Sequence, residues 1–273
     1  MIKTLGNNIV SAFTGGNPVK AIYAYGQLVW EKPSSNNKIF YTSTDGNIVT
    51  PDIGTGEESK GFGANIVSNI YSGGRGVIVF DGDVTKIGYT AFGRCNTLQT
   101  IVIPDSVTSI GSYAFSYCER LTSITIPDSV ISIGKNAFFS CERLTSITIP
   151  NGITSIDIGV FENCSSLTTI TIPDGVTSIG QVAFYGCTSL ISITIPFSVR
   201  DIEYNAFKDC NQLSEVIVNA VIPPNLYPEQ YTGIYNQFEN NAPGRKIKVP
   251  AESLQVYKTA DGWSEYSSSI ISQ

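Results

Sequence analysis

The chain has 273 residues, of which 42% are hydrophobic and 15% are charged, and its formal net charge is −6. This length and hydrophobic fraction suffice for a sizeable core, and without a basic stripe nucleic acid is not an expected partner. The chain contains no histidine, which removes the commonest general base and the usual zinc ligand, so we expect neither an enzyme nor a cofactor. No apolar run reaches the roughly 18 residues that a membrane span needs.

Residues 1–32 are predicted to form a small N-terminal β module, because "VKAIYAYGQLVW" places two apolar runs around Gly26 as in a hairpin. Residues 33–38 break the hydrophobic pattern as a linker does. The first thirty residues lack the compact apolar segment of a signal peptide. Residues 39–75 alternate short apolar runs with glycine-rich turns, and we expect them to cap the open end of the repeat array that begins at residue 76.

A strict 23-residue period governs residues 76–218, and a period of this length predicts a solenoid. The unit reads "L-x-x-I-x-I-P-D-x-V-x-x-I-G-x-x-A-F-x-x-C-x-x". Its most regular positions are phenylalanine (Phe92, Phe115, Phe138, Phe161, Phe184, Phe207), leucine (Leu98, Leu121, Leu144, Leu167, Leu190, Leu213) and cysteine (Cys95, Cys118, Cys141, Cys164, Cys187, Cys210). Proline ends five of the predicted strands, at Pro104, Pro127, Pro150, Pro173 and Pro196.

Each unit carries one short strand in which apolar and hydroxyl side chains alternate. In one copy Ile124 and Ile126 face one way and Ser123 and Thr125 the other, as in a strand with one buried face. One unit cannot bury that face alone, so we expect the copies to stack with parallel strands about 4.8 Å apart.

The two ends of the array depart from the pattern. The segment 76–92 is predicted to be a divergent first rung, because Ile78 and Phe80 precede Ile101 and Ile103 by one period. At the other end, residues 219–246 interrupt the period with an aromatic insert, and residues 247–273 are predicted to form a closing strand and a short amphipathic helix.

The motifs "L-x-x-I-x-I-P", "V-x-x-I-G-x-x-A-F" and "C-x-x-L" resemble the BspA-like, treponemal-type leucine-rich repeats of bacterial surface proteins. The resemblance covers residues 39–273 and implies a mostly β solenoid with short helical or 3-10 turns, capped at both ends. It also implies an extracellular or cell-surface location and non-enzymatic adhesion or recognition of a protein or glycan partner. The alternative function is a structural spacer that presents the N-terminal module, which is similar to segments of phage-associated proteins.

Two columns of the repeat are open to a structural and a chemical interpretation. The cysteines share the structural period and form no C-x-x-C motif, which favours a ladder of buried thiols, although bridges between adjacent rungs fit disulfide geometry. Asp105, Asp128 and Asp174 form a column that either hydrogen-bonds its own turns or binds calcium, and Asn151 and Phe197 interrupt it.

Two surfaces are candidate binding sites. The first is the outward hydroxyl face with Thr125, Thr148, Thr171 and Thr194, which β-propensity and cross-strand packing also explain, and whose spacing superficially suits an ice lattice. The second comprises four aromatic residues of the insert and two departures in the last unit: Tyr227, Tyr231, Tyr235, Phe238, Phe197 and Arg200. The alternative for the insert is a hydrophobic lid on the end of the solenoid.

Overall fold

The structure is a computed structural model that describes the N-terminal strands between residues 2 and 31 as backbone, and residues 36–53, 61–230 and 232–273 with their side chains. The N-terminal strands form two small antiparallel sheets. The first holds β1 (Ile2–Leu5), β2 (Asn8–Thr14) and β3 (Asn17–Pro18), and the second is a hairpin of β4 (Ala21–Ala24) and β5 (Gln27–Glu31). The hairpin lies where the sequence predicts one.

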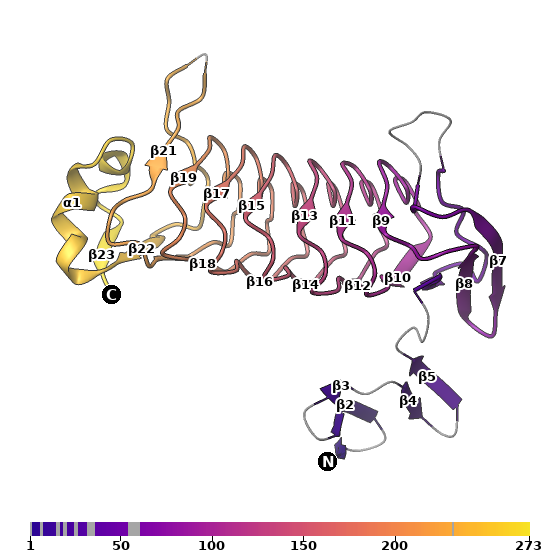
Figure 1. Ribbon diagram of the computed structural model, residues 1–273. Helices are drawn as coiled ribbons and strands as arrows, with labels where there is room; N and C mark the ends of the chain where they lie inside the picture. Colours follow the sequence, from indigo (N-terminus) through magenta and orange to yellow (C-terminus); the bar gives the residue numbers. More distant parts are fainter. Residues whose placement is uncertain are drawn as a thin grey trace.

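Three antiparallel strands, in the order β6-β8-β7, cap the first end of the solenoid (Figure 1). These strands are β6 (Lys38–Ser43), β7 (Ile66–Ser72) and β8 (Arg75–Phe80), and β6 pairs with β10 (Leu98–Val102), the first long strand of the array. The prediction that Ile78 and Phe80 begin the first rung is therefore wrong: both are buried, but β6 separates their strand from β10. The glycine turn at residues 73–74, with positive φ at both positions, pairs β8 with β7 instead.

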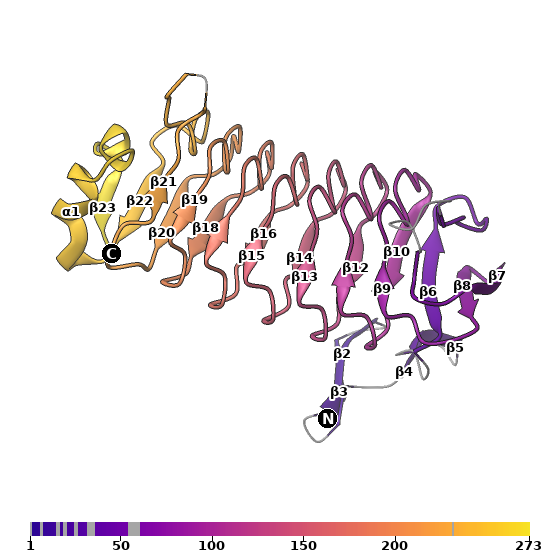
Figure 2. The same ribbon diagram turned by 45° about the horizontal axis from the view of Figure 1, so that its top comes forward.

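The array itself is a solenoid of parallel strands in two columns that run along its length (Figures 1 and 2). The column of longer strands continues from β10 through β12 (Ser123–Thr125), β14 (Ser146–Thr148), β16 (Thr169–Thr171), β18 (Ser192–Ile195) and β20 (Glu215–Val218). The second column holds β9 (Lys86–Ile87), β11 (Ser109–Ile110), β13 (Ser132–Ile133), β15 (Ser155–Ile156), β17 (Ser178–Ile179) and β19 (Asp201–Ile202). Paired residues are one period apart, as Ile101 and Ile124 are, so the predicted register is confirmed.

A column of stacked rings fills the core. The six periodic phenylalanines and Phe238 are fully buried, and successive rings lie 5.2–5.6 Å apart with interplanar angles of 1–19°. Phe62 meets Phe92 edge-on at the first end, and Trp263 and Tyr266 contact Phe238 at an angle at the last. Tilted aromatic residues therefore close the column at both caps.

The return segment of each rung contains two residues with left-handed backbone, such as Tyr113 and Tyr117, both at φ 58°. Four of the six rungs have glycine two residues before the first of them, where adjacent rungs approach closely, and the other two have Asp157 and Glu203. A Cβ on Gly111 would lie 2.8 Å from the backbone of Gly88, and one on Gly134 would lie 2.5 Å from the backbone nitrogen of Ser112. The close approach of adjacent rungs therefore favours glycine in the repeated "I-G" dipeptide.

The last turns of the solenoid incorporate the insert. β21 (Asn225–Leu226) extends the second column, and β22 (Lys246–Val249) extends the first, with Ile247 opposite Val216, 31 residues (247 − 216) earlier. A 3-10 turn (Ala251–Ser253), α1 (Leu254–Thr259), another 3-10 turn (Trp263–Tyr266) and β23 (Ile270–Ser272) complete the chain. The predicted closing strand and helix are confirmed, whereas β23, which pairs with β22, was not predicted.

Candidate functional site

The aromatic residues of the insert do not gather into one site. Phe238 is 1% exposed and continues the ring column, so its predicted contact with a partner is wrong: the insert replaces the missing phenylalanine of its rung with this residue. Tyr231 lies outside the described residues. The other two predicted tyrosines, Tyr227 and Tyr235, lie in different surroundings.

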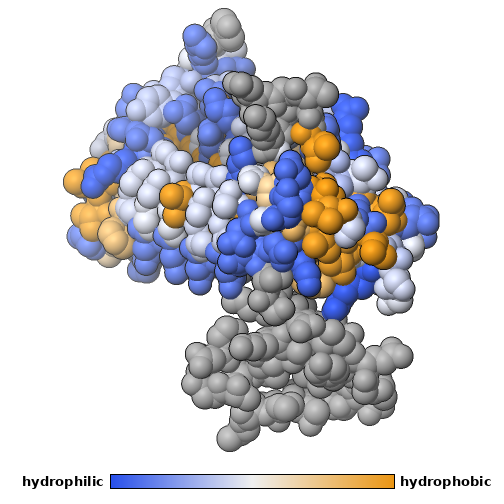
Figure 3. Space-filling view, turned by 45° about the vertical axis from the view of Figure 1, so that its right-hand side comes forward, coloured by the Kyte–Doolittle hydropathy of each residue, from blue (hydrophilic) through white to orange (hydrophobic). Residues whose placement is uncertain are grey.

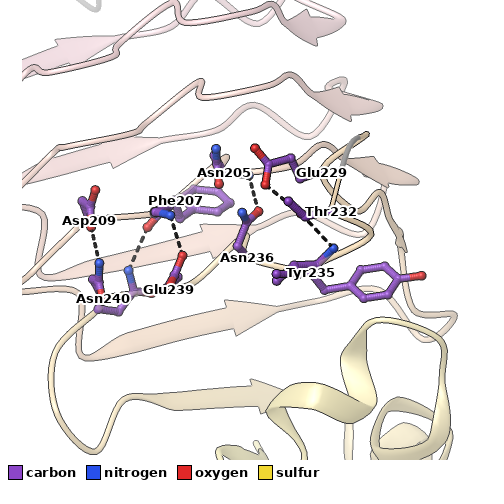
Figure 4. Close-up of polar contacts among 12 residues, drawn as sticks. Asn205, Phe207, Asp209, Glu229, Thr232, Tyr235, Asn236, Glu239 and Asn240 are labelled. Carbon is purple, nitrogen blue, oxygen red and sulfur yellow. Dashed lines mark hydrogen bonds and ion pairs between the residues drawn. The ribbon is translucent and has the colours of Figure 1, made fainter.

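The return arm of the insert is bonded to the rung before it (Figure 4). Backbone amides of Phe207 and Asp209 donate to carbonyl oxygens of the arm at 2.9 Å, and Nδ2 of Asn240 donates to Oδ1 of Asp209 at 2.6 Å. The arm therefore behaves as one more rung, which supports the structural interpretation of this part of the insert.

Tyr235 attaches the insert to the C-terminal cap. Its hydroxyl donates to Oδ2 of Asp261 at 2.9 Å, and its carbonyl oxygen accepts a bond from the hydroxyl of Tyr266 at 2.8 Å. Its ring lies so close to Gly262 that a Cβ there would be 2.6 Å from a ring carbon. These contacts are those expected of a lid residue.

A groove of about 380 Å³ lies where the chain turns from the long strands to the second column near the C-terminal end. It brings together two predicted residues, Phe197 and Arg200, with two that the sequence analysis missed, Val221 and Ile222. Phe197 is 66% exposed, Val221 55% and Ile222 78%. The signal available in the sequence was the run "AVIPP", whose prolines end a strand and leave the apolar residues before them in a turn.

The outer wall of the groove, residues 219–224, is fixed by the C-terminal cap. The hydroxyl of Tyr257 donates to the carbonyl oxygen of Ala220 at 2.7 Å. The indole nitrogen of Trp263 donates to the carbonyl oxygen of Pro224, also at 2.7 Å. Both donors are fully buried. The exposed apolar side chains are thus carried on a wall that buried bonds hold in place.

Polar groups line one margin of the groove. Asn225 lines it directly, and its Nδ2 donates to Oδ1 of Asp201 at 2.9 Å. The hydroxyl of Tyr227 donates to the same oxygen at 3.1 Å, and this bond raises the pKa of Tyr227. Arg200, which is exposed, places a positive charge beside the apolar wall. Tyr227 is therefore linked through Asp201 to Asn225 at the margin of the groove.

The predicted face of exposed hydroxyl side chains is present on the long strands. Some of the threonines beside it form hydrogen bonds between adjacent rungs. Thr125, Thr148, Thr171 and Thr194 are exposed on the long strands, as predicted. Beside them, the hydroxyls of two neighbouring threonines, Thr122 and Thr168, donate to backbone oxygens one rung earlier at 3.2–3.3 Å. Because these bonds join adjacent rungs, they explain why hydroxyl residues recur at the position of Thr122 and Thr168 without any need for a bound ligand.

The six cysteines are free thiols, and five are fully buried. Each buried thiol donates to the carbonyl oxygen of the phenylalanine 26 residues earlier, for example Cys164 to Phe138 at 3.2 Å. Burial raises the pKa of Cys164 to about 12. The predicted thiol ladder is confirmed, and the bridged alternative is wrong.

Within the residues that the structure describes, no three metal-ligating side chains converge, including those of the aspartate column. In the same part of the chain no helix is long and apolar enough to cross a bilayer.

The repeat sequence is that of a known family. The model of the BspA-type leucine-rich repeat region matches residues 85–214 in six copies. A leucine-rich repeat protein of T. pallidum is 31% identical over 51% of this chain and 67% of its own, with a TM-score of 0.49. The chain belongs to the BspA-type leucine-rich repeat family. Its members are repeat scaffolds, and no catalytic family is indicated.

Two further solved structures are similar to this member of the family. A leucine-rich cell surface protein from Faecalibacterium prausnitzii A2-165 is 28% identical over 69% of this chain and 63% of its own, with a TM-score of 0.43. A leucine-rich repeat protein from Bacteroides ovatus is 20% identical over 77% and 74%, with a TM-score of 0.39. None of the curated proteins compared matches the sequence.

Proposed function

We propose that this BspA-type chain is a non-enzymatic recognition protein that acts at a bacterial surface and binds a protein or glycan partner through the groove beside Phe197 and Arg200. The family membership and the cell-surface description of the F. prausnitzii protein support the location. The groove supports the binding role, because an aromatic ring and an arginine side by side are the residue types that most often anchor an interface.

One observation carries the proposal: the rung that forms the groove is the one that abandons the repeat. The position of Phe197 holds aspartate or asparagine in the four preceding rungs, at Asp105, Asp128, Asn151 and Asp174. The position of Arg200 holds Thr108, Ile131, Thr154 and Thr177. Other rungs of the array fold with aspartate or asparagine at the first position, so stability alone does not call for a phenylalanine that leaves 66% of its surface in solvent.

The groove suits an extended partner that offers an apolar group and an acceptor or negative charge. Phe197, Val221 and Ile222 supply apolar surface, Arg200 supplies the complementary charge, and the hydroxyl of Tyr227 is held nearby by Asp201. An acidic segment of a protein, or a glycan with a carboxylate, has both features.

The test uses a variant that restores the repeat, Phe197→Asp with Arg200→Thr. It should fold as well as the wild type, because both residues already occupy these positions in neighbouring rungs. Binding of the purified chain to a panel of extracellular-matrix proteins and glycans should be saturable, and the variant should lose at least tenfold in affinity. The matched control is Ile131→Thr, which changes an apolar residue 63% exposed in the same column, three rungs away.

The outcomes separate the candidate surfaces. Binding that survives in the restored variant would contradict the groove and move the site to the hydroxyl face, where Thr148→Val and Thr171→Val would then reduce it. A panel without any saturable ligand would favour the alternative of a structural spacer that presents the N-terminal module.

A further inference from the structure

An apolar row crosses the outward face of the N-terminal cap. Direct strand pairing sets Val102 opposite Phe40, Phe40 opposite Val77, and Val77 opposite Ile70. The row thus spans the four strands β10, β6, β8 and β7. Burial alternates along β6 and β8, so their inner residues lie in the core and the row points away from it.

The row is a departure from the rest of this face. Val102 pairs on its other side with Thr125, the first of the exposed threonines, so the row meets the hydroxyl face at the cap. Polar groups border the row: the hydroxyls of Thr42 and Thr100 share a hydrogen bond of 2.7 Å, and the guanidinium of Arg75 lies 5.7 Å from the centre of the Phe40 ring. Ile70 is 62% exposed, and Val67, at the irregular pairing of β7, is 66% exposed. Figure 3 shows apolar surface gathered at this end of the molecule. Contiguous apolar surface of this kind normally has an occupant.

The segment best placed to cover it is the N-terminal module. Residue 36 is already fixed to the cap, because its carbonyl oxygen accepts a bond from the amide of Val84 at 2.8 Å. Only residues 32–35 separate it from the end of β5 at Glu31. Fully extended, this link spans about 18 Å. The module is therefore held at high effective concentration beside the face.

The module also needs a partner surface. Residues 1–31 contain no cysteine that could stabilise the fold with a disulfide. Its second sheet is a two-stranded hairpin, β4–β5, and such hairpins are at best marginally stable until one face is buried. The hairpin sequence "AIYAYGQLVWE" is rich in apolar residues, including Trp30.

We propose that the hairpin β4–β5 packs on the outward face of the cap and covers the row Val102–Phe40–Val77–Ile70. The module is then a docked part of the cap. It extends the core beyond the face of the cap sheet and leaves the C-terminal groove free for a partner.

Trp30 reports this docking in the full-length chain, because Trp263 is the only other tryptophan. The difference between the emission of the wild type and of Trp30→Phe isolates the Trp30 signal. Trp30 should be shielded from acrylamide, and Ile70→Asp with Val77→Asp should raise its quenching constant at least threefold and shift its emission to the red. Val256→Asp, which puts the same charge on a residue 53% exposed at the far end, should leave both unchanged.

Circular dichroism checks that the solenoid stays folded in both variants. A Trp30 that is as accessible in the wild type as free tryptophan would overturn the proposal. Shielding that disappears on dilution, together with a dimer mass by light scattering, would also overturn it, because a second copy would then cover the face. Hydrogen exchange gives an independent readout: amides of residues 21–31 should lose protection in the double aspartate variant only.

Discussion

Phe161, at the middle of the ring column, offers the sharpest test of how the array is held together. Its ring is fully buried and stacks on Phe138 at 5.6 Å and on Phe184 at 5.4 Å. Phe161→Leu keeps most of the apolar volume but removes both ring pairs, each worth about 0.5–1.5 kcal/mol. We therefore expect a loss of about 1–3 kcal/mol in the free energy of unfolding. Phe161→Ala also leaves a cavity, and its expected loss is about 3–5 kcal/mol.

The assay is urea denaturation followed by circular dichroism, with hydrogen exchange to resolve the rungs on either side. Rung-level data matter because long repeat arrays can lose their all-or-none transition. Phe197→Leu is the control, since this ring is 66% exposed, and its effect should stay within about 0.5 kcal/mol. A loss below about 0.5 kcal/mol for Phe161→Leu would refute the claim that stacked rings stabilise the array.

Other columns of the repeat give three further predictions. Stability should fall as the pH rises above 9: the pKa of Cys164 is about 12 in the folded chain against 9.0 for the free group, so above pH 9 the unfolded state binds fewer protons. Each such thiol contributes up to about 1.4 kcal/mol per pH unit, and Cys164→Ala should flatten urea midpoints measured between pH 8 and 10. Gly180→Ala should cost about 1–3 kcal/mol in the same assay, because its Cβ would lie 2.8 Å from the carbonyl carbon of Asp157, whereas Gly175→Ala, with its nearest atom at 3.5 Å, should change little. Val182→Asn should raise the melting temperature, since Val182 has a left-handed φ of 49°, which a β-branched residue adopts at a cost of about 1–2 kcal/mol and asparagine adopts more readily; an unchanged or lower value would contradict this.

The core of the array could be predicted because its constraints repeat. One register places every periodic leucine and phenylalanine and five of the six cysteines inside, and each rung meets its neighbour in the same way. The two caps could not be predicted in this detail. Ile78 and Phe80 match the repeat spacing, yet the order of the cap strands depends on β6 pairing with β10, residues 38–43 with 98–102. Spacing alone carries no information about such long-range pairing.

The insert shows a second limit of sequence reasoning. Its aromatic density predicted a binding loop, but Phe238 completes the ring column and Tyr235 attaches to the cap. Both roles depend on a rung lengthened from 23 to 31 residues, so no periodic pattern marks them. The groove also depends on a contact between residues far apart in the sequence, since the hydrogen bond that fixes Ala220 comes from Tyr257, 37 residues later.

The uniformity of the middle rungs bears on where specificity can reside. A partner that lay only along Thr125, Thr148, Thr171 and Thr194 would meet nearly the same surface after a shift by one rung, so several registers would have similar free energies. Specific recognition requires a difference between such alternatives. Phe197 and Arg200 supply that difference at the C-terminal end, because no other described rung pairs an exposed aromatic with an arginine at these two positions. Loss of the groove should therefore relax the register of a bound partner even where the hydroxyl face retains some affinity.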